Sequence, residues 1–286
     1  MKIVFTSDLH YPITHKWQLK ELVENIAAEN PNAVILGGDI AENLKDSQET
    51  NSFTFPHFRL CLELFTKRLT CPVLVILGNH DLWTDSPSNN SLMIWNNIGD
   101  VVKSCGAVYL EDNPQIIIDK PTNVMIIGSY LHYDYSAAEK TGVASGYDKD
   151  YWRINKHRVN NDGHYLKGLP DDIEFAGALA RSLKTQLVDA EQDATIQNII
   201  VATHVPCMEQ QMTRRPADVG WAMGTPYFGN LSCQDFISSC DKVRWVIAGH
   251  SHCHEDHTVT VGGDRSIRVM TLGADYRRPI YQVMEI

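Results

Sequence analysis

The sequence predicts a mixed α/β fold, and three observations support this prediction. Five short apolar runs, rich in valine and isoleucine and as long as buried strands, end on polar side chains. Amphipathic segments separate the first three runs, which is typical of parallel strands joined by right-handed helical crossovers. After residue 252 the pattern changes to short alternating runs between turns, which predicts antiparallel strands at the end of the chain.

The predicted elements follow this pattern in chain order. The five apolar runs that end on polar donors are residues 3–6, 33–36, 73–77, 199–202 and 245–248. Apolar residues at helical spacing predict helices over residues 16–29, 58–69, 91–104 and 174–190. Further strands are expected at residues 107–110, 115–118, 124–128, 258–261, 266–272 and 280–285.

Size and charge narrow the class of protein. With 286 residues, 43% of them hydrophobic and 21% charged, the chain has the composition of a globular protein. Candidate ligands run from Asp8 to His252, so we expect one domain over residues 1–286. The 25 basic and 35 acidic residues give a net charge of −10, which disfavours extended nucleic-acid binding.

Cysteine usage and the absence of long apolar runs bear on the compartment. The seven cysteines are scattered and form no Cys-x-x-Cys pair, which is typical of reduced thiols. The apolar run at the N-terminus is too short for a signal peptide, and no run approaches the roughly 20 residues of a membrane span. We therefore expect a cytoplasmic protein without membrane contact, and the sequence leaves its oligomeric state open.

Residues 132–169 differ from the rest of the chain. They are rich in tyrosine, aspartate, lysine, glycine and asparagine and lack sustained periodicity. Within residues 149–168, five lysine and arginine residues stand against two aspartates, a local charge of 5 − 2 = +3. Two interpretations stay open: a solvated loop, or a cap whose cations meet an anionic substrate.

Metal-binding side chains follow all five apolar runs. Strand ends of an open α/β sheet converge on one crevice, so these side chains are expected to meet there. Imidazole, carboxylate and carboxamide groups suit zinc, manganese, iron or nickel. The candidate ligands are Asp8, His10, Asp39, Asn79, His204, His250 and His252, and His80 lies beside them.

The number of donors favours two metals. A shared site needs a bridging ligand, and Asp39 is the natural candidate because Gly37 and Gly38 allow a tight turn before it. Two metals roughly 3.5–4 Å apart can hold a hydroxide and neutralise a phosphoryl group during in-line displacement. The sequence contains neither a Gly-x-Ser-x-Gly elbow nor a Walker-type loop, which agrees with a reaction that needs no protein nucleophile.

Five motifs, taken in order, resemble those of the calcineurin-like metallophosphoesterases. The resemblance covers residues 1 to about 255 and implies a β-sandwich of mixed sheets with flanking helices. It also implies hydrolysis of a phosphate ester at a dinuclear metal centre. The motifs are Asp8-Leu9-His10, Gly38-Asp39, Gly78-Asn79-His80-Asp81, Thr203-His204 and Gly249-His250-Ser251-His252.

The resemblance also implies a role for each motif residue. His80 would not be a ligand but would face the substrate and protonate the leaving group, with Asp81 orienting its ring. Asn79 and His80 would contact the substrate. One metal would be held by Asp8, His10, Asp39 and His252, and the other by Asp39, Asn79, His204 and His250.

The motifs indicate the metal ligands but leave the substrate contacts and the class of function open. His132 follows a predicted strand and could reach the pocket, and Arg153 could contact an anion. The favoured substrate is a small phosphorylated compound or nucleotide, and the choice between monoester and diester stays open. A nuclease or DNA-repair phosphodiesterase on the same fold, and a non-catalytic protein-binding scaffold, are the alternatives.

Overall fold

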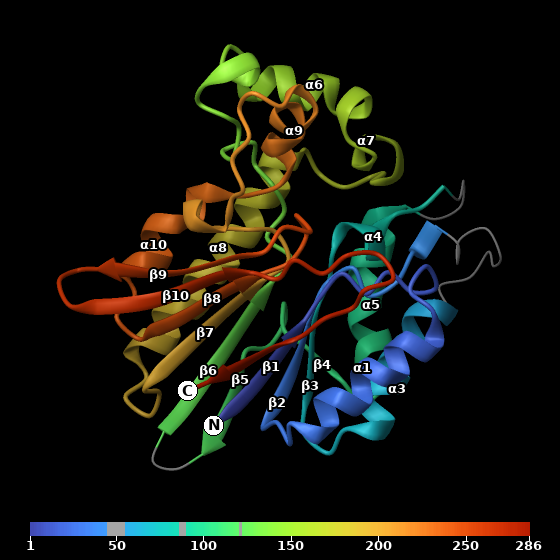
Figure 1. The fold of residues 1–286 in the computed structure, drawn as a ribbon, viewed down its shortest axis with the longest axis vertical. Coiled ribbons are helices and arrows are strands. Elements are labelled where there is room, and N and C mark those ends of the chain that lie inside the picture. The colour runs from blue at the N-terminus through green and yellow to red at the C-terminus, as the bar shows by residue number, and fades with distance from the viewer. Residues whose placement is uncertain (45–54, 86–89, 120–121) are drawn as a thin grey trace.

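The computed structural model describes residues 1–44, 55–85, 90–119 and 122–286. Two mixed β-sheets face each other, with helices on their outer sides (Figure 1). The first sheet has the order β11-β1-β2-β3-β4, in which β1 to β4 are parallel and β11 is antiparallel to β1. Its strands are β1 (Lys2–Thr6), β2 (Ala33–Gly37), β3 (Val73–Ile76), β4 (Val108–Tyr109) and β11 (Gln282–Glu285).

The second sheet has the order β5-β6-β7-β8-β10-β9. Its four inner strands are parallel, and the edge strands β5 and β9 are antiparallel to their neighbours. The predicted antiparallel tail is confirmed for the β9–β10 pair and for β11, and β10 also pairs in parallel with β8. The strands are β5 (Gln115–Asp119), β6 (Thr122–Ser129), β7 (Asn198–Thr203), β8 (Val243–Ala248), β9 (Glu255–Val261) and β10 (Arg265–Thr271).

The apolar core lies in three layers because side chains alternate along each strand. Ile3 and Phe5 of β1 pack with Ile200 and Ile247 of the second sheet, between the two sheets. Val4, between them in sequence, packs instead with the helices outside the first sheet. A third cluster joins the outer face of the second sheet to its helices. Both faces of each sheet are thus covered, which explains why the inner strands are apolar throughout.

Helices cover the outer faces of both sheets (Figure 1). All four predicted helices are present, within two residues of the predicted bounds. Beside the first sheet lie α1 (Lys16–Ala28), α3 (Pro56–Arg68), α4 (Asn79–Leu82) and α5 (Ser91–Ser104). Beside the second lie α8 (Asp172–Gln192) and α10 (Gln234–Ser239). The remaining short elements after β7 are η2 (Glu209–Gln211), α9 (Val219–Gly224), η3 (Thr225–Tyr227) and η4 (Leu231–Cys233).

The segment over residues 132–169 contains helices that the sequence analysis did not predict. They are η1 (Gly142–Ala144), α6 (Lys149–Val159) and α7 (Asp162–Tyr165). In α6 only Trp152 is buried, so no apolar stripe marks the helix in the sequence. The side chain of Asp148 caps its first turn by accepting a hydrogen bond from Tyr151 N at 2.8 Å. Helices α6, α7 and α9 lie beyond the carboxyl ends of the strands (Figure 1).

The cysteines and helices test the expectations of reduced thiols and of no membrane-spanning segment. All seven cysteines are free thiols, as their scattered spacing predicts. Cys61, Cys207 and Cys233 are completely buried and pack in the apolar clusters. Within the described residues, no helix is long and apolar enough to cross a membrane.

Candidate metal centre

The loops after β1, β2 and β8 hold the predicted donors in an unusual backbone conformation. Non-glycine residues with positive φ are uncommon, and each costs of order 1–3 kcal/mol unless the surrounding structure compensates. Such strain is concentrated at functional sites. At these loops, φ lies between 46° and 70° for five predicted ligands: Asp8, His10, Asp39, His250 and His252.

Two glycines allow the loops to approach one another. Gly38 has φ of 93°, and a Cβ atom there would lie 2.5 Å from His204 Nδ1. A Cβ atom on Gly78 would lie 2.1 Å from Asp39 Oδ1. The glycine before Asp39 therefore permits the predicted tight turn and also makes room for His204.

The predicted donors converge in space. They form three groups of side chains whose donor atoms lie within 4.8 Å of one another. Asp8, His10, Asp39 and His204 are buried, and His250 and His252 are partly exposed. The three groups are Asp8, His10 and His252; His10, Asp39 and His80; and Asp39, His204 and His250.

Each histidine among the predicted ligands has one ring nitrogen fixed by an acceptor outside the cluster. Such an acceptor sets the tautomer and orients the other nitrogen, as partners of metal-bound histidines commonly do. The fixed nitrogens and their acceptors are His10 Nδ1 with Glu42 Oε1 at 2.7 Å, His204 Nδ1 with Gly37 O at 2.9 Å, His250 Nε2 with Tyr227 O at 2.9 Å and His252 Nδ1 with Ala274 O at 2.7 Å.

The second nitrogen of His10 tests whether the site fits a metal. Among the residues that the structure describes, none hydrogen-bonds to His10 Nε2, although this atom is buried. It lies 3.7 Å from Asp39 Oδ2. A buried polar atom without a hydrogen-bond partner is costly. The position of His10 Nε2 among carboxylates therefore fits a nitrogen that would coordinate a metal ion.

Asp39 lies at the centre of the donor cluster. Its Oδ1 accepts a hydrogen bond from His80 N at 2.8 Å and lies 3.5 Å from His204 Nε2. Its Oδ2 lies on the side of His10, so the two oxygens face different groups of donors. Burial raises the pKa of this carboxyl, but the neighbouring His204, His80 and His10 outweigh burial and hold it well below the usual value. A carboxylate facing both ways is suited to bridge two cations.

Asn79 completes the cluster at the start of α4. Its Oδ1 lies 3.2 Å from His204 Nε2, and its Nδ2 donates to Asp162 Oδ1 at 2.9 Å. No sequence motif marks Asp162, because the residue lies in a different segment, 83 positions further along the chain.

His80 is held by Glu42 and Trp83. Its Nδ1 lies 2.9 Å from Glu42 Oε1, and its ring stacks on Trp83 with centroids 3.6 Å apart. The ring was expected to be oriented by Asp81, and here the structure differs. The carboxylate of Asp81 accepts instead from Gly78 N and Ala41 N, each at 2.9 Å. Burial, followed by the charge of Asp39, raises the pKa of Asp81 to about 7.

The structure places neither His132 nor Arg153, the two further predicted substrate contacts, in the donor cluster. His132 is completely buried, and its ring nitrogens bond to Tyr130 Oη at 2.8 Å and Asp172 Oδ1 at 2.7 Å. Arg153 is exposed and pairs with Asp150 and Asp171. Both side chains thus have partners outside the donor cluster, and their contact with the substrate stays a prediction.

Tyr276 is a residue of the site that the sequence analysis missed. Its ring lies over the imidazoles of His10 and His252, with centroid distances of 4.3 and 5.2 Å. It lies in the turn between β10 and β11, where neither periodicity nor a motif marks it.

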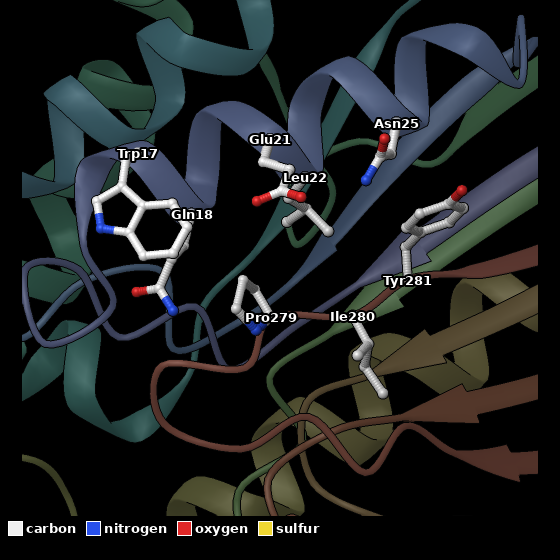
Figure 2. A pocket seen from close by; sticks show the side chains of 8 residues that line it. All are labelled: Trp17, Gln18, Glu21, Leu22, Asn25, Pro279, Ile280 and Tyr281. Atoms are coloured by element: carbon white, nitrogen blue, oxygen red, sulfur yellow. The ribbon is translucent and has the colours of Figure 1, made fainter.

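A separate cavity lies between α1 and the chain that leads into β11 (Figure 2). It has a volume of about 390 Å³ and is lined by Trp17, Gln18, Glu21, Leu22, Asn25, Pro279, Ile280 and Tyr281. None of these residues is a predicted ligand. The cavity is therefore separate from the donor cluster at the strand ends.

The fold and the cluster define a class of protein. Two facing mixed sheets with buried histidine and aspartate clusters are typical of metal-dependent phosphoesterases. The chain belongs to the calcineurin-like phosphoesterase family, whose model matches residues 1–254. This is a family of phosphoric ester hydrolases, and the resemblance drawn from the five motifs is confirmed. Among curated proteins, none matches the chain.

Solved structures share the fold at low sequence identity. The phosphopantetheinyl hydrolase of Mycobacterium tuberculosis has a TM-score of 0.69 and 20% identity, over 97% of this chain and 90% of that one. A dimetal phosphatase from Danio rerio has a TM-score of 0.52 and 14% identity, over 95% and 86% of the two chains. These structures support the predicted α/β architecture.

Proposed function

We propose that this protein hydrolyses a phosphate ester with two divalent metal ions. One ion would be held by Asp8, His10, Asp39 and His252, and the other by Asp39, Asn79, His204 and His250. The observation that carries the proposal is the buried, unpartnered His10 Nε2 among carboxylates, in a cluster whose four predicted histidine ligands each have the other ring nitrogen bonded to an acceptor outside it. Manganese is our first choice of ion, and zinc, iron and nickel suit the same donors.

The protein's own residues would position the ester and move a proton. When bound, two such ions neutralise the phosphoryl oxygens and make a bound water acidic enough to attack. Without metal, burial lowers the pKa of His80, but Asp39 and Glu42 raise it to about 9. From this position His80 would donate its proton to the leaving oxygen, and Asn79 would contact the phosphoryl group.

Glu42 and Asp81 would act through other residues. Glu42 contacts both His10 and His80, so it would orient a ligand and the proton donor together. Asp81 would preserve the loop that carries Asn79 and His80, because it ties Gly78 N to Ala41 N. We thus assign Asp81 a positioning role rather than direct contact with the substrate.

The substrate would be a small phosphorylated compound or nucleotide. Helices α6 and α7 lie beyond the strand ends, where they would cap the site. Three of the five cations in residues 149–168 already form ion pairs: Lys149 with Asp134, Lys156 with Asp172, and Arg153 with Asp150 and Asp171. Shape and aromatic contacts would therefore contribute more to selectivity than the local charge. The free thiols favour action in the cytoplasm.

Hydrolysis of chromogenic esters tests the proposal. Protein reconstituted with Mn²⁺ should hydrolyse p-nitrophenyl phosphate or its diester, and chelated protein should not. Asp39→Asn should lower activity by more than about 100-fold, since even partners outside the ligand set cost 10–100-fold. Asp256→Asn on β9, which alters an ion pair with Arg268 on β10, is the matched control. Inert Mn²⁺-loaded protein on a panel of monoesters, diesters, nucleotides and phosphopantetheinyl compounds would refute the proposal.

A further inference from the structure

Asp162, the first residue of α7, connects the segment beyond the strand ends to the metal centre. Its side chain is completely buried. Three neutral groups from other elements donate hydrogen bonds to its carboxylate: Asn79 Nδ2 to Oδ1 at 2.9 Å, Trp83 Nε1 to Oδ1 at 2.6 Å and Tyr133 Oη to Oδ2 at 2.9 Å. A buried carboxylate is expensive unless it is bonded, so this arrangement is more than a surface contact.

The chemistry of these contacts determines which way the amide of Asn79 points. A carboxylate oxygen only accepts hydrogen bonds, so the face of Asn79 toward Asp162 is its NH₂ group. The carbonyl oxygen Oδ1 must then face the opposite way, where it lies 3.2 Å from His204 Nε2. The oxygen is the only atom of this amide that can bind a cation. Asp162 therefore presents the correct end of Asn79 to the donor cluster.

Backbone contacts hold Asp162 in place. Tyr165 O, at the end of α7, accepts from Thr84 N at 3.1 Å, and Lys167 O accepts from Ser91 N at 2.8 Å. Ser91 Oγ accepts in turn from Lys167 N at 2.9 Å. The ring of Tyr165 also lies 5.1 Å from that of Trp83. The end of α7 is thus attached to Thr84, just after α4, and Asn79 is the first residue of that helix.

We propose that Asp162 is a positioning residue for the second metal, acting through the orientation of the Asn79 amide. The proposal rests on the proposed function, because it concerns a ligand of that dinuclear centre. It also gives residues 132–169 a role beyond covering the site. The segment supplies a side chain without which one ligand is free to turn.

Metal titration of the stripped protein tests this role without turnover. Calorimetric titration with Mn²⁺ should show two binding events in the unchanged protein. Asp162→Ala should weaken one of them about 10- to 100-fold and leave the other within about threefold. Asp162→Asn should restore most of the affinity, because its amide oxygen can accept from Asn79 while its NH₂ donates to the hydroxyl of Tyr133. Asp150→Ala, on the exposed side of α6, is the control.

A double variant separates positioning from general stability. In an Asn79→Ala background the amide is absent, so Asp162→Ala should cost no further metal affinity. An additional loss of the same size there would show that Asp162 acts by another route and would overturn the proposal. If the unchanged protein binds no metal, the proposed function fails. If it binds two and Asp162→Ala also binds two normally, only this inference fails.

A second experiment does not depend on folding of Asp162→Ala. Asn79→Asp would place the carboxylate of residue 79 against that of Asp162. Adding the isosteric Asp162→Asn to this variant should therefore tighten Mn²⁺ binding at the second site at least threefold relative to Asn79→Asp alone. In the unchanged background, the same Asp162→Asn substitution should not tighten it. Equal effects of Asp162→Asn in the two backgrounds would contradict the contact. Thermal unfolding of each metal-free variant confirms that the compared proteins are folded.

Discussion

At the scale of single residues, Glu42 is the side chain whose removal should change the pH dependence of activity. Burial lowers the pKa of His80, whereas Asp39 and Glu42 raise it to about 9. Glu42→Gln removes one of these charges, so the pKa of His80 should fall. If protonated His80 is the acid, the alkaline limb of the kcat profile should move to lower pH, and kcat should fall about 10- to 100-fold.

The control for Glu42→Gln is metal content. Glutamine retains an oxygen that can accept from His10, so Mn²⁺ should still bind at near-normal stoichiometry. An unchanged alkaline limb, in a variant that binds metal normally, would contradict the assignment of Glu42 and His80 as a pair.

His80 and Asp39 should differ in what they contribute. His80→Ala should leave metal content near normal and lower turnover about 100-fold, because the ring is fixed by Glu42 and Trp83 and serves as the acid. Asp39→Asn should weaken both metals, since its oxygens face different donor groups. Elemental analysis and kinetics of the two variants check this. Equal metal loss in both would instead make His80 a ligand, as its closeness to Asp39 and His10 allows.

The sequence motifs predicted the side chains that converge in the cluster, but not the neighbouring residues that contact them. Asp8, His10 and Asp39 were found because they follow strands whose ends converge. Glu42, Asp162 and Tyr276 were missed because each acts through contacts that only the tertiary structure creates. Asp81 was given the wrong contact for the same reason, since adjacency in sequence does not fix where a side chain points.

At the scale of elements, the start of α8 holds α6 through Asp172. Its carboxylate bonds to Lys156 Nζ and His132 Nε2, each at 2.7 Å, and to the hydroxyl of Tyr135. Asp172→Ala leaves Lys156 and His132 without this partner in a largely buried site. We expect a loss of about 3 kcal/mol in the free energy of unfolding, measured by chemical denaturation of the metal-free protein.

Hydrogen exchange shows where the effect of Asp172→Ala is felt. Amides of α6 should lose more protection than those of α5, which has its own apolar contacts with the first sheet. Asp150→Ala, in an exposed pair on the same helix, should change little. If α5 and α6 lost protection equally, the contacts of Asp172 would not be what holds α6 in place.

The elements that were predicted well are those with an apolar face. Helix α1 buries Leu19, Leu22, Val23 and Ile26, at a spacing that the sequence displays directly. Helix α6 buries one residue and was therefore not predicted. The parallel pairing of β10 with β8 was not predicted, because alternation indicates a strand without identifying its neighbours.

At the scale of the whole molecule, the donor cluster lies at the strand ends, where loops from the two sheets meet. Asp8 and His10 follow β1 of the first sheet, and His252 follows β8 of the second. Asp39 likewise follows β2, whereas His204 and His250 follow β7 and β8. The strand pattern by itself predicted only that the strand ends meet, whereas the two facing sheets were implied by the family resemblance and are confirmed. Each metal would consequently join one sheet to the other.

Metal binding should therefore stabilise the entire fold and not a single loop. Ligands that bind only the folded state add RT ln(1 + [L]/Kd), about 2.7 kcal/mol per site at 100 times Kd. Saturating Mn²⁺ should raise the Tm of the stripped protein in one cooperative transition, and a chelator should reverse the shift. Asp39→Asn, which weakens both sites, should lose most of the shift, whereas His80→Ala should retain it. A shift of equal size in Asp39→Asn would mean that the metal stabilises the protein from somewhere other than the junction of the sheets.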